Sequence, residues 1–219
     1  MSANLDYAAA RSAMVNSQLR PNKLLDEELA DALGAVPREL FVPKELRGIA
    51  YVDEDIAIGN GRYLLEPLVL TRMLQAAEIE PDDMVLDVAC VTGYAAAVMS
   101  SFSGTVVALE SDPDLVATAT QILADMDITN VAVIEGDLRE GLADQGPYDV
   151  ILIEGAVAEV PPALLDQLAE GGRLVAVLRD GDVGVANLFT RKGAIGRRPL
   201  FDAATPMLPG FEKKKGFVF

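Results

Sequence analysis

Acidic side chains stand at the ends of four successive apolar runs. Asp87, Glu110, Asp137 and Glu154 each follow a short segment rich in valine, isoleucine and leucine, a composition typical of buried strands. The carboxyl ends of parallel strands meet at one edge of a sheet, so these four groups should line one crevice. Carboxylates repel phosphates and accept hydrogen bonds from hydroxyl and amine groups. The pattern therefore predicts a site for a ligand without phosphate.

The spacing of two of these acids indicates a ribose. Glu110 lies 23 residues after Asp87, close to the offset at which an acidic residue binds a ribose diol in dinucleotide sites. S-adenosyl-L-methionine fits such a crevice, because it offers a ribose diol, an adenine amine, an ammonium group and a sulfonium. The alternative is that acids at strand ends are solvated loop residues or helix caps.

The segment from Met84 to Tyr94 joins a strand, a tight turn and a helix. Backbone N–H groups point out of such a turn toward a ligand. The turn calls for small residues at positions 89, 91 and 93, and only Gly93 is a glycine. Ala89 brings a methyl group to the closest approach of the ligand. Val91 costs about 1–3 kcal/mol if its φ is positive, and crowds the pocket if φ is ordinary.

The remaining pattern alternates strands with helices, which predicts right-handed crossovers and a mostly parallel sheet. Expected strands cover 84–88, 105–109, 130–134, 148–153, 173–178, 183–190 and 195–201, and expected helices cover 3–20, 26–34, 67–77, 94–99, 112–126 and 161–168. The last two strands should form an antiparallel edge hairpin. Residues 51–67 are expected to be a loop because of Gly59 and Gly61. We expect a Rossmann-like α/β core over 66–219, with a helical cap and acceptor loop over 1–65.

Composition excludes several kinds of chemistry. The chain has 219 residues and no histidine, which removes serine–histidine and histidine–metal sites. Cys90 is the only cysteine, and it is either a reactive thiol at a helix N-terminus or a small buried apolar residue. A formal net charge of −16 opposes nucleic-acid binding. We expect a cytoplasmic protein without a membrane span or a metal, a monomer or weak dimer.

Several short motifs follow one another along the chain. They are Pro37-Arg38-Glu39-Leu40-Phe41-Val42-Pro43, Ala50-Tyr51, Ile58-Gly59-Asn60-Gly61, Pro67, the strand–turn–helix segment above, Glu135-Gly136-Asp137 and Gly171-Gly172-Arg173-Leu174-Val175. In these motifs the chain resembles the protein-L-isoaspartate O-methyltransferases. The resemblance extends over roughly residues 10–180, and its most specific motif is the proline-bounded segment 37–43.

The resemblance implies a class I methyltransferase with a seven-stranded Rossmann-like sheet. It implies S-adenosyl-L-methionine as cofactor, S-adenosyl-L-homocysteine as product, and repair of damaged protein by methylation of an isoaspartyl carboxylate. Asp87 would bind the ammonium group, Glu110 the ribose and Asp137 the adenine amine. The other expected cofactor positions are Ala89, Val91, Gly93, Leu138 and Glu154.

Two departures from the family pattern leave alternatives open. In the acceptor loop, Arg62 and Leu65 stand where the family has glutamine and serine, so Arg62 either binds the acceptor carboxylate or is a solvated loop arginine. The acceptor is then an isoaspartyl protein or an unknown small carboxylate. The second departure is the glycine-poor turn at Ala89 and Val91. It supports an alternative hypothesis, a non-catalytic binding or scaffold protein with a weakened pocket. A nicotinamide dehydrogenase is disfavoured because an acidic crevice opposes a pyrophosphate.

Overall fold

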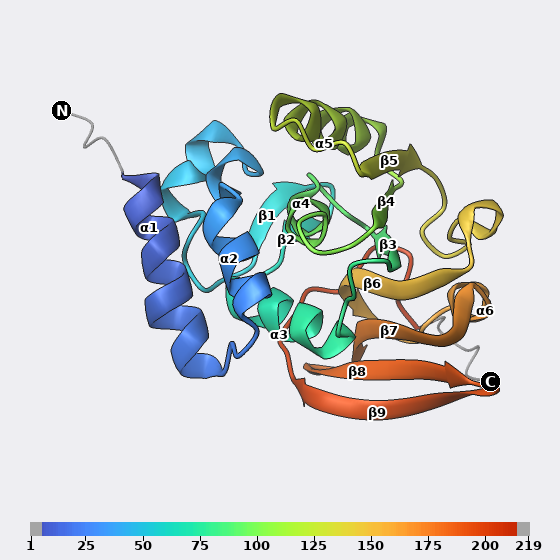
Figure 1. The fold of residues 1–219 in the computed structure, drawn as a ribbon. Helices are drawn as coiled ribbons and strands as arrows, with labels where there is room; N and C mark the ends of the chain where they lie inside the picture. The colour runs from blue at the N-terminus through green and yellow to red at the C-terminus, as the bar shows by residue number, and fades with distance from the viewer. Residues whose placement is uncertain (1–5, 214–219) are drawn as a thin grey trace, which may run out of the picture.

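A seven-stranded sheet forms the centre of the molecule (Figure 1). The computed structural model describes residues 6–213. The strand order is β5-β4-β3-β6-β7-β8-β9, and the first five strands are parallel. β8 is antiparallel to both of its neighbours, so β8 and β9 form the predicted edge hairpin. The strands are β3 (Met84–Val88), β4 (Thr105–Glu110), β5 (Val131–Glu135), β6 (Tyr148–Val157), β7 (Leu168–Asp180), β8 (Val183–Lys192) and β9 (Ala194–Asp202).

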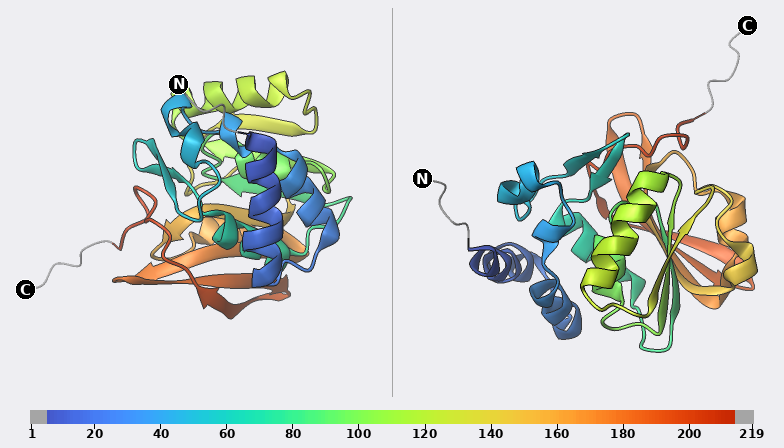
Figure 2. Two further views of the ribbon diagram at one scale, coloured as in Figure 1. Left: turned by 90° about the vertical axis from the view of Figure 1, so that its left-hand side faces the viewer. Right: turned by 90° about the horizontal axis from the view of Figure 1, so that it is seen from above.

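Helices cover both faces of this sheet, as the pleat of its central strands requires. On β3, Val85 belongs to one hydrophobic core and its neighbour Leu86 to the other. The larger core joins the sheet to the N-terminal helices and to the helices that follow β3 and β4, while α6 packs in the smaller core (Figure 2). The helices around the sheet are α3 (Pro67–Ala77), α4 (Tyr94–Met99), α5 (Pro113–Asp125) and α6 (Pro162–Asp166).

The N-terminal part is helical and lies against one side of the sheet (Figure 1). α1 (Tyr7–Ala13) continues through a π-helical turn (Met14–Leu19) into a 3₁₀ turn (Arg20–Asn22). α2 (Glu27–Ala35) begins at Asp26, whose carboxylate accepts a hydrogen bond from the Leu29 amide. Two further 3₁₀ segments, Arg38–Leu40 and Lys44–Ile49, lead toward the sheet. The division at residue 65 into cap and core stays a prediction.

The prediction of a loop over residues 51–67 is wrong in one respect. Two short antiparallel strands, β1 (Ile56–Gly59) and β2 (Arg62–Leu64), form a hairpin there. Its turn places Gly59, Asn60 and Gly61 at positive φ, which glycine and asparagine tolerate. The other predicted elements are observed, but β6 runs four residues past its predicted end to Val157, and β7 begins five residues early, at Leu168, which was predicted to be helical. Residues 3–5 of the first predicted helix lie outside the described part of the chain. The hairpin matters because it brings Arg62 to the ends of the strands.

Candidate functional site

The strand order of the sheet reverses at β3. In sheets of this kind, ligands bind beside the C-terminal end of the strand at which the order reverses. β3 pairs with β4 on one side and with β6 on the other, so the two crossovers diverge from this point. The turn after β3 is strained. Ala89 has φ 64°, Val91 has φ 54° and Gly93 has φ 87°. A β-branched residue is a clear outlier in this region, so the turn keeps the backbone of a glycine loop with side chains in two of its positions.

Gly93 packs against α5. A Cβ there would lie 3.4 Å from Ala119 Cβ and from Leu123 Cδ1, an ordinary contact distance, so a larger residue would be strained by the positive φ rather than by lack of space. The Ala89 and Cys90 amides both donate to the Leu109 carbonyl, at 2.9 and 3.2 Å, and hold the turn against β4. Cys90 is fully buried, and burial raises the pKa of its thiol well above the usual value. It is therefore a small core residue here.

Glu110, at the end of β4, is fully buried and already bound by the chain itself. Arg62 of the β1–β2 hairpin donates to its carboxylate from Nε (3.1 and 3.2 Å) and from Nη2 (3.1 Å). The amides of Val91, Ser111 and Asp112 also donate to it, at 3.3, 2.7 and 3.1 Å. The carboxylate predicted to bind a ribose thus has a full set of internal partners.

Asp87, one residue before the end of β3, and Glu154, three residues before the end of the adjacent strand β6, lack such partners. The prediction that Glu154 ends its strand is therefore wrong, because β6 continues to Val157. Both acidic side chains are buried, and none of their four carboxyl oxygens has a hydrogen-bond donor among the described residues. Burial raises the pKa of Asp87 to about 7 and raises the pKa of Glu154 well above its usual value, and the neighbouring Asp87 carboxylate raises the pKa of Glu154 further. Such a pair, enclosed and unpartnered, suits a cationic ligand.

This pair should make the protein less stable as pH rises. Since burial raises the pKa of both groups, the folded chain binds more protons than the unfolded chain between about pH 4 and the folded value near 7 for Asp87. The free energy of unfolding therefore falls with rising pH in this window. We expect the melting temperature to fall from pH 5 to pH 8, measured by circular dichroism. The isosteric variant D87N/E154Q should show a flatter curve; equal slopes in both proteins would contradict the assignment.

The other predicted residues lie apart from this buried group. Asp137 is exposed after β5, and its carboxylate accepts from the Arg139 amide at 2.8 Å, while the neighbouring Leu138 is buried in the smaller core. Leu65 is buried in the larger core, and its carbonyl accepts from Arg38 Nη2 at 2.6 Å. The structure therefore brings together Asp87, Ala89, Val91, Glu110, Glu154 and Arg62 at the strand ends. The roles assigned to each residue stay predictions.

A residue near this site that the sequence did not single out is Leu208. It lies against Gly155, directly after Glu154, where any Cβ would collide with its side chain. The Leu208 amide donates to the Ala156 carbonyl, and the Ala156 amide donates to the Pro206 carbonyl, both at 2.8 Å. The segment after β9 thus covers the end of β6. The glycine at position 155 was the only sequence signal for this close approach.

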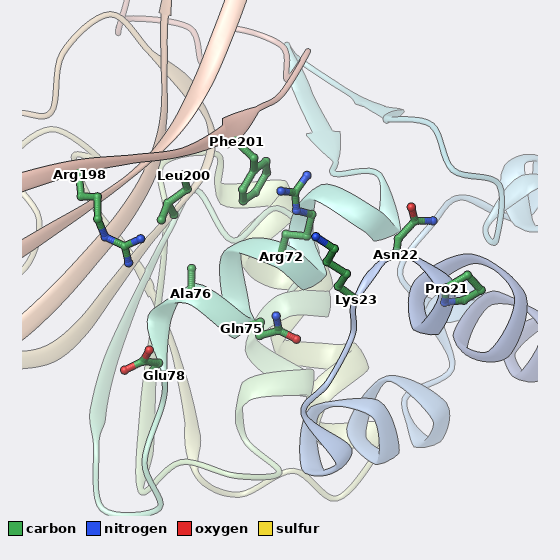
Figure 3. A pocket seen from close by; sticks show the side chains of 10 residues that line it. All are labelled: Pro21, Asn22, Lys23, Arg72, Gln75, Ala76, Glu78, Arg198, Leu200 and Phe201. Atoms are coloured by element: carbon green, nitrogen blue, oxygen red, sulfur yellow. The ribbon is translucent and has the colours of Figure 1, made fainter.

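A hollow of about 590 Å³ lies elsewhere, between the second half of α3, residues 21–23 and β9. Figure 3 shows Lys23, Arg72 and Arg198 around it, with the Arg72 guanidinium 3.8 Å from the ring centroid of Phe201. The three basic side chains are exposed, and Glu78 stands in the same wall. None of its lining residues is one of the predicted site residues, so this open surface hollow is not the predicted site.

The described part of the chain offers neither a metal-binding cluster nor a membrane-spanning helix. Among residues 6–213, no group of three or more histidine, cysteine, aspartate or glutamate side chains is arranged to hold a metal ion. Within the same residues, no helix is both long enough and apolar enough to span a bilayer.

Comparison with known sequences gives a consistent family. Residues 9–196 match the family model of the protein-L-isoaspartate(D-aspartate) O-methyltransferases. A protein-L-isoaspartate O-methyltransferase from Koribacter versatilis is 43% identical over 169 residues, which are 77% of this chain and 76% of the relative. Another, from Methanoculleus marisnigri, is 36% identical over 191 residues, 87% of each chain.

Comparison with solved structures gives the same fold. A protein-L-isoaspartate O-methyltransferase from Plasmodium falciparum, in complex with S-adenosyl-L-homocysteine, superposes with a TM-score of 0.80 and 22% identity over 90% of this chain and 97% of that chain. A second protein-L-isoaspartate O-methyltransferase structure has a TM-score of 0.80 and 25% identity over 91% of this chain and 66% of that one.

Proposed function

Because this chain belongs to the protein-L-isoaspartate(D-aspartate) O-methyltransferase family, we propose that it transfers a methyl group from S-adenosyl-L-methionine to the carboxylate of an isoaspartyl residue in damaged protein. The observation that carries this proposal is the enclosed pair Asp87 and Glu154. The two carboxyl groups are buried at the switch point of the sheet and lack donors from the described residues. A ligand with an ammonium group would supply the missing partner.

The residues at the strand ends fit the chemical groups of S-adenosyl-L-methionine. Asp87, with Glu154 beside it, would hold the ammonium group. Glu110 would accept from the ribose diol after giving up Arg62, and Asp137 would accept from the adenine amine. Leu138 would contribute apolar surface, and the backbone of the 89–93 turn would lie along the ligand. The steric complementarity of this site to the ligand is poorer than its electrostatic complementarity, because positions 89 and 91 carry side chains where the family has glycine.

When bound, S-adenosyl-L-methionine supplies a methyl group on a positively charged sulfur. The acceptor carboxylate is ionised at neutral pH, so the chain need not remove a proton from it. The main task of the protein is then to align the acceptor with the methyl group and to exclude water. The β1–β2 hairpin is the element positioned for this alignment, although Leu65 offers no hydroxyl and Arg62 is bound to Glu110.

The proposal is tested by methyl transfer to a pair of peptides. The chain is incubated with S-adenosyl-L-methionine labelled in its methyl group and with an isoaspartyl peptide or its aspartyl counterpart. We expect a base-labile methyl ester on the isoaspartyl peptide alone. D87N should lose this transfer, while D144N, in the surface turn Ala143–Gln145, should keep it. Equal transfer to both peptides would point to a small or general carboxylate acceptor instead.

A second candidate function is favoured by one observation. Glu110 is saturated by Arg62 and three backbone amides, as expected for a binding or scaffold protein that has the fold but no longer binds the cofactor. A thermal-shift titration separates the two functions, since a ligand that binds only the folded state raises its melting temperature. A shift with S-adenosyl-L-homocysteine supports the methyltransferase, and its absence up to millimolar ligand supports the second candidate.

The partners and location follow from the same proposal. We infer a cytoplasmic monomer or weak dimer that meets its protein acceptor transiently. A net charge of −16 opposes nucleic acid as a partner. Sedimentation velocity at several protein concentrations would measure the oligomeric state.

A further inference from the structure

The pair between Arg62 and Glu110 links two parts of the proposed site that lie 48 residues apart. Arg62 belongs to the hairpin expected to meet the acceptor, and Glu110 ends the strand expected to bind the cofactor. Their side chains are 6% and 0% exposed, so the pair is enclosed. Nε of the guanidinium donates to both carboxylate oxygens, at 3.1 and 3.2 Å, and Nη2 donates to Oε1 at 3.1 Å. Hydrogen bonds between two charged groups are stronger than those between neutral groups.

Glu110 has no acceptor capacity to spare while this pair is formed. Its Oε1 accepts from Arg62 and from the amides of Ser111 and Asp112, and its Oε2 accepts from Arg62 and from the Val91 amide. A ribose diol needs two acceptor positions on this same carboxylate. The guanidinium and the diol are therefore competitors for Glu110.

The hairpin is fixed to the rim of the site by two further contacts. Arg62 Nη2 donates to Ser111 Oγ at 2.9 Å, and Asn60 Nδ2 donates to Asp112 Oδ2 at 2.7 Å. The contact of Asn60 lowers the pKa of Asp112, so this carboxylate stays ionised and remains a good acceptor. The three side-chain contacts hold the whole turn 59–62 over the segment that follows β4.

We propose that the β1–β2 hairpin is a latch on the cofactor site: Arg62 occupies Glu110, and S-adenosyl-L-methionine binds only by displacing it. The inference rests on the proposed function, because it concerns the affinity of that same site. The exchange moves no proton and forms no covalent bond. Glu110 gives up a guanidinium and accepts two hydroxyl donors, while Arg62 leaves with the hairpin toward the acceptor side. Cofactor affinity is then set by how strongly the hairpin is held.

The latch is tested by isothermal titration of S-adenosyl-L-homocysteine into the full chain and three variants. R62Q removes the positive charge. R62K keeps the charge but has one donor nitrogen instead of two, so R62K replaces R62Q in the test if R62Q folds poorly. N60G removes only the outer contact, because glycine tolerates the positive φ of this position. We expect R62Q to bind at least tenfold more tightly than the unaltered chain, with smaller gains for R62K and N60G. R20Q is the matched control, since Arg20 pairs with Glu27 on the surface of the N-terminal helices and should leave the affinity unchanged.

A second readout is the thermal stability of R62Q with and without ligand. Without ligand, R62Q leaves the Glu110 carboxylate buried without a counter-charge, so its melting temperature should fall below that of the unaltered chain. Saturating S-adenosyl-L-homocysteine should raise the melting temperature of R62Q more than that of the unaltered chain.

The outcomes separate the latch from the proposed function. If the unaltered chain binds S-adenosyl-L-homocysteine and both Arg62 variants bind it equally or more weakly, the latch is overturned and the function stands. If no folded variant binds at millimolar ligand, both the cofactor assignment and the latch fall. Tighter binding by R62Q and R62K, with R20Q unchanged, supports both.

Discussion

Replacing Arg38 with alanine is expected to lower the free energy of unfolding by about 2–4 kcal/mol, because two backbone carbonyls lose their buried donor. Arg38 is fully buried between the N-terminal segment and the acceptor hairpin. Its guanidinium donates to the Ala50 carbonyl at 2.7 Å and to the Leu65 carbonyl at 2.6 Å, and lies 4.8 Å from the Tyr94 ring centroid. Each carbonyl left unpaired costs about 1–3 kcal/mol, offset in part because a buried charge is removed.

Urea denaturation followed by circular dichroism measures this change. R20A is the matched control, because Arg20 forms an exposed pair with Glu27 and should leave the unfolding midpoint unaltered. R38K should fall between the two, since one ammonium group cannot reach both carbonyls in the same geometry. An R38A variant as stable as R20A would show that water or rearranged side chains satisfy Ala50 and Leu65.

The double variant A89G/V91G is expected to bind S-adenosyl-L-homocysteine at least tenfold more tightly than the unaltered chain. Both positions have positive φ, so glycine fits the backbone as it stands and removes side-chain atoms from the ligand's path. The folding stability should change little. Relief of strain is worth about 1–3 kcal/mol per residue, while burial of a valine side chain contributes about 1.5–3 kcal/mol.

Isothermal titration of the double variant and of each single variant measures the gain. V91G should account for most of it, because its isopropyl group is larger and β-branched. A G34A variant is a suitable control, since a Cβ at Gly34 in α2 meets no other atom. Unchanged affinity in all glycine variants would mean that Arg62, rather than the turn, limits binding. The Val91 amide contacts Glu110, so the effects of V91G and R62Q should not be additive.

The sequence is sufficient to predict the sheet and its switch point. Asp87 and Glu110 stand at strand ends as expected, because continuous apolar runs bounded by turn residues specify buried parallel strands. The family and the Rossmann-like fold are confirmed by the comparisons. The hairpin at 56–64 escaped prediction because its strands are only four and three residues long and two glycines interrupt the pattern.

The partners of the acidic residues could not be predicted from spacing. Arg62 and Glu110 are 48 residues apart, and nothing in the local pattern of either segment indicates that they meet. The same holds for Leu208 and Gly155, which approach only because the segment after β9 returns across the sheet.

The positive φ of Val91 was predicted as one of two possibilities, since the backbone conformation of a turn is set by its whole length and not by one residue. The C-terminal apolar residues 217–219 lie outside the described part of the chain.

The outer edge of β9 has a consequence for the solution behaviour of the protein. β9 is the last strand of the sheet, and most of its residues are exposed, so one row of its backbone groups is available to another chain. Pro199 removes one of these donors, and Arg198 places a positive charge beside it. Prolines and charges of this kind prevent the edge strands of two molecules from pairing edge to edge in aggregates. A P199V/R198V variant should therefore lose solubility on concentration while its fold stays intact.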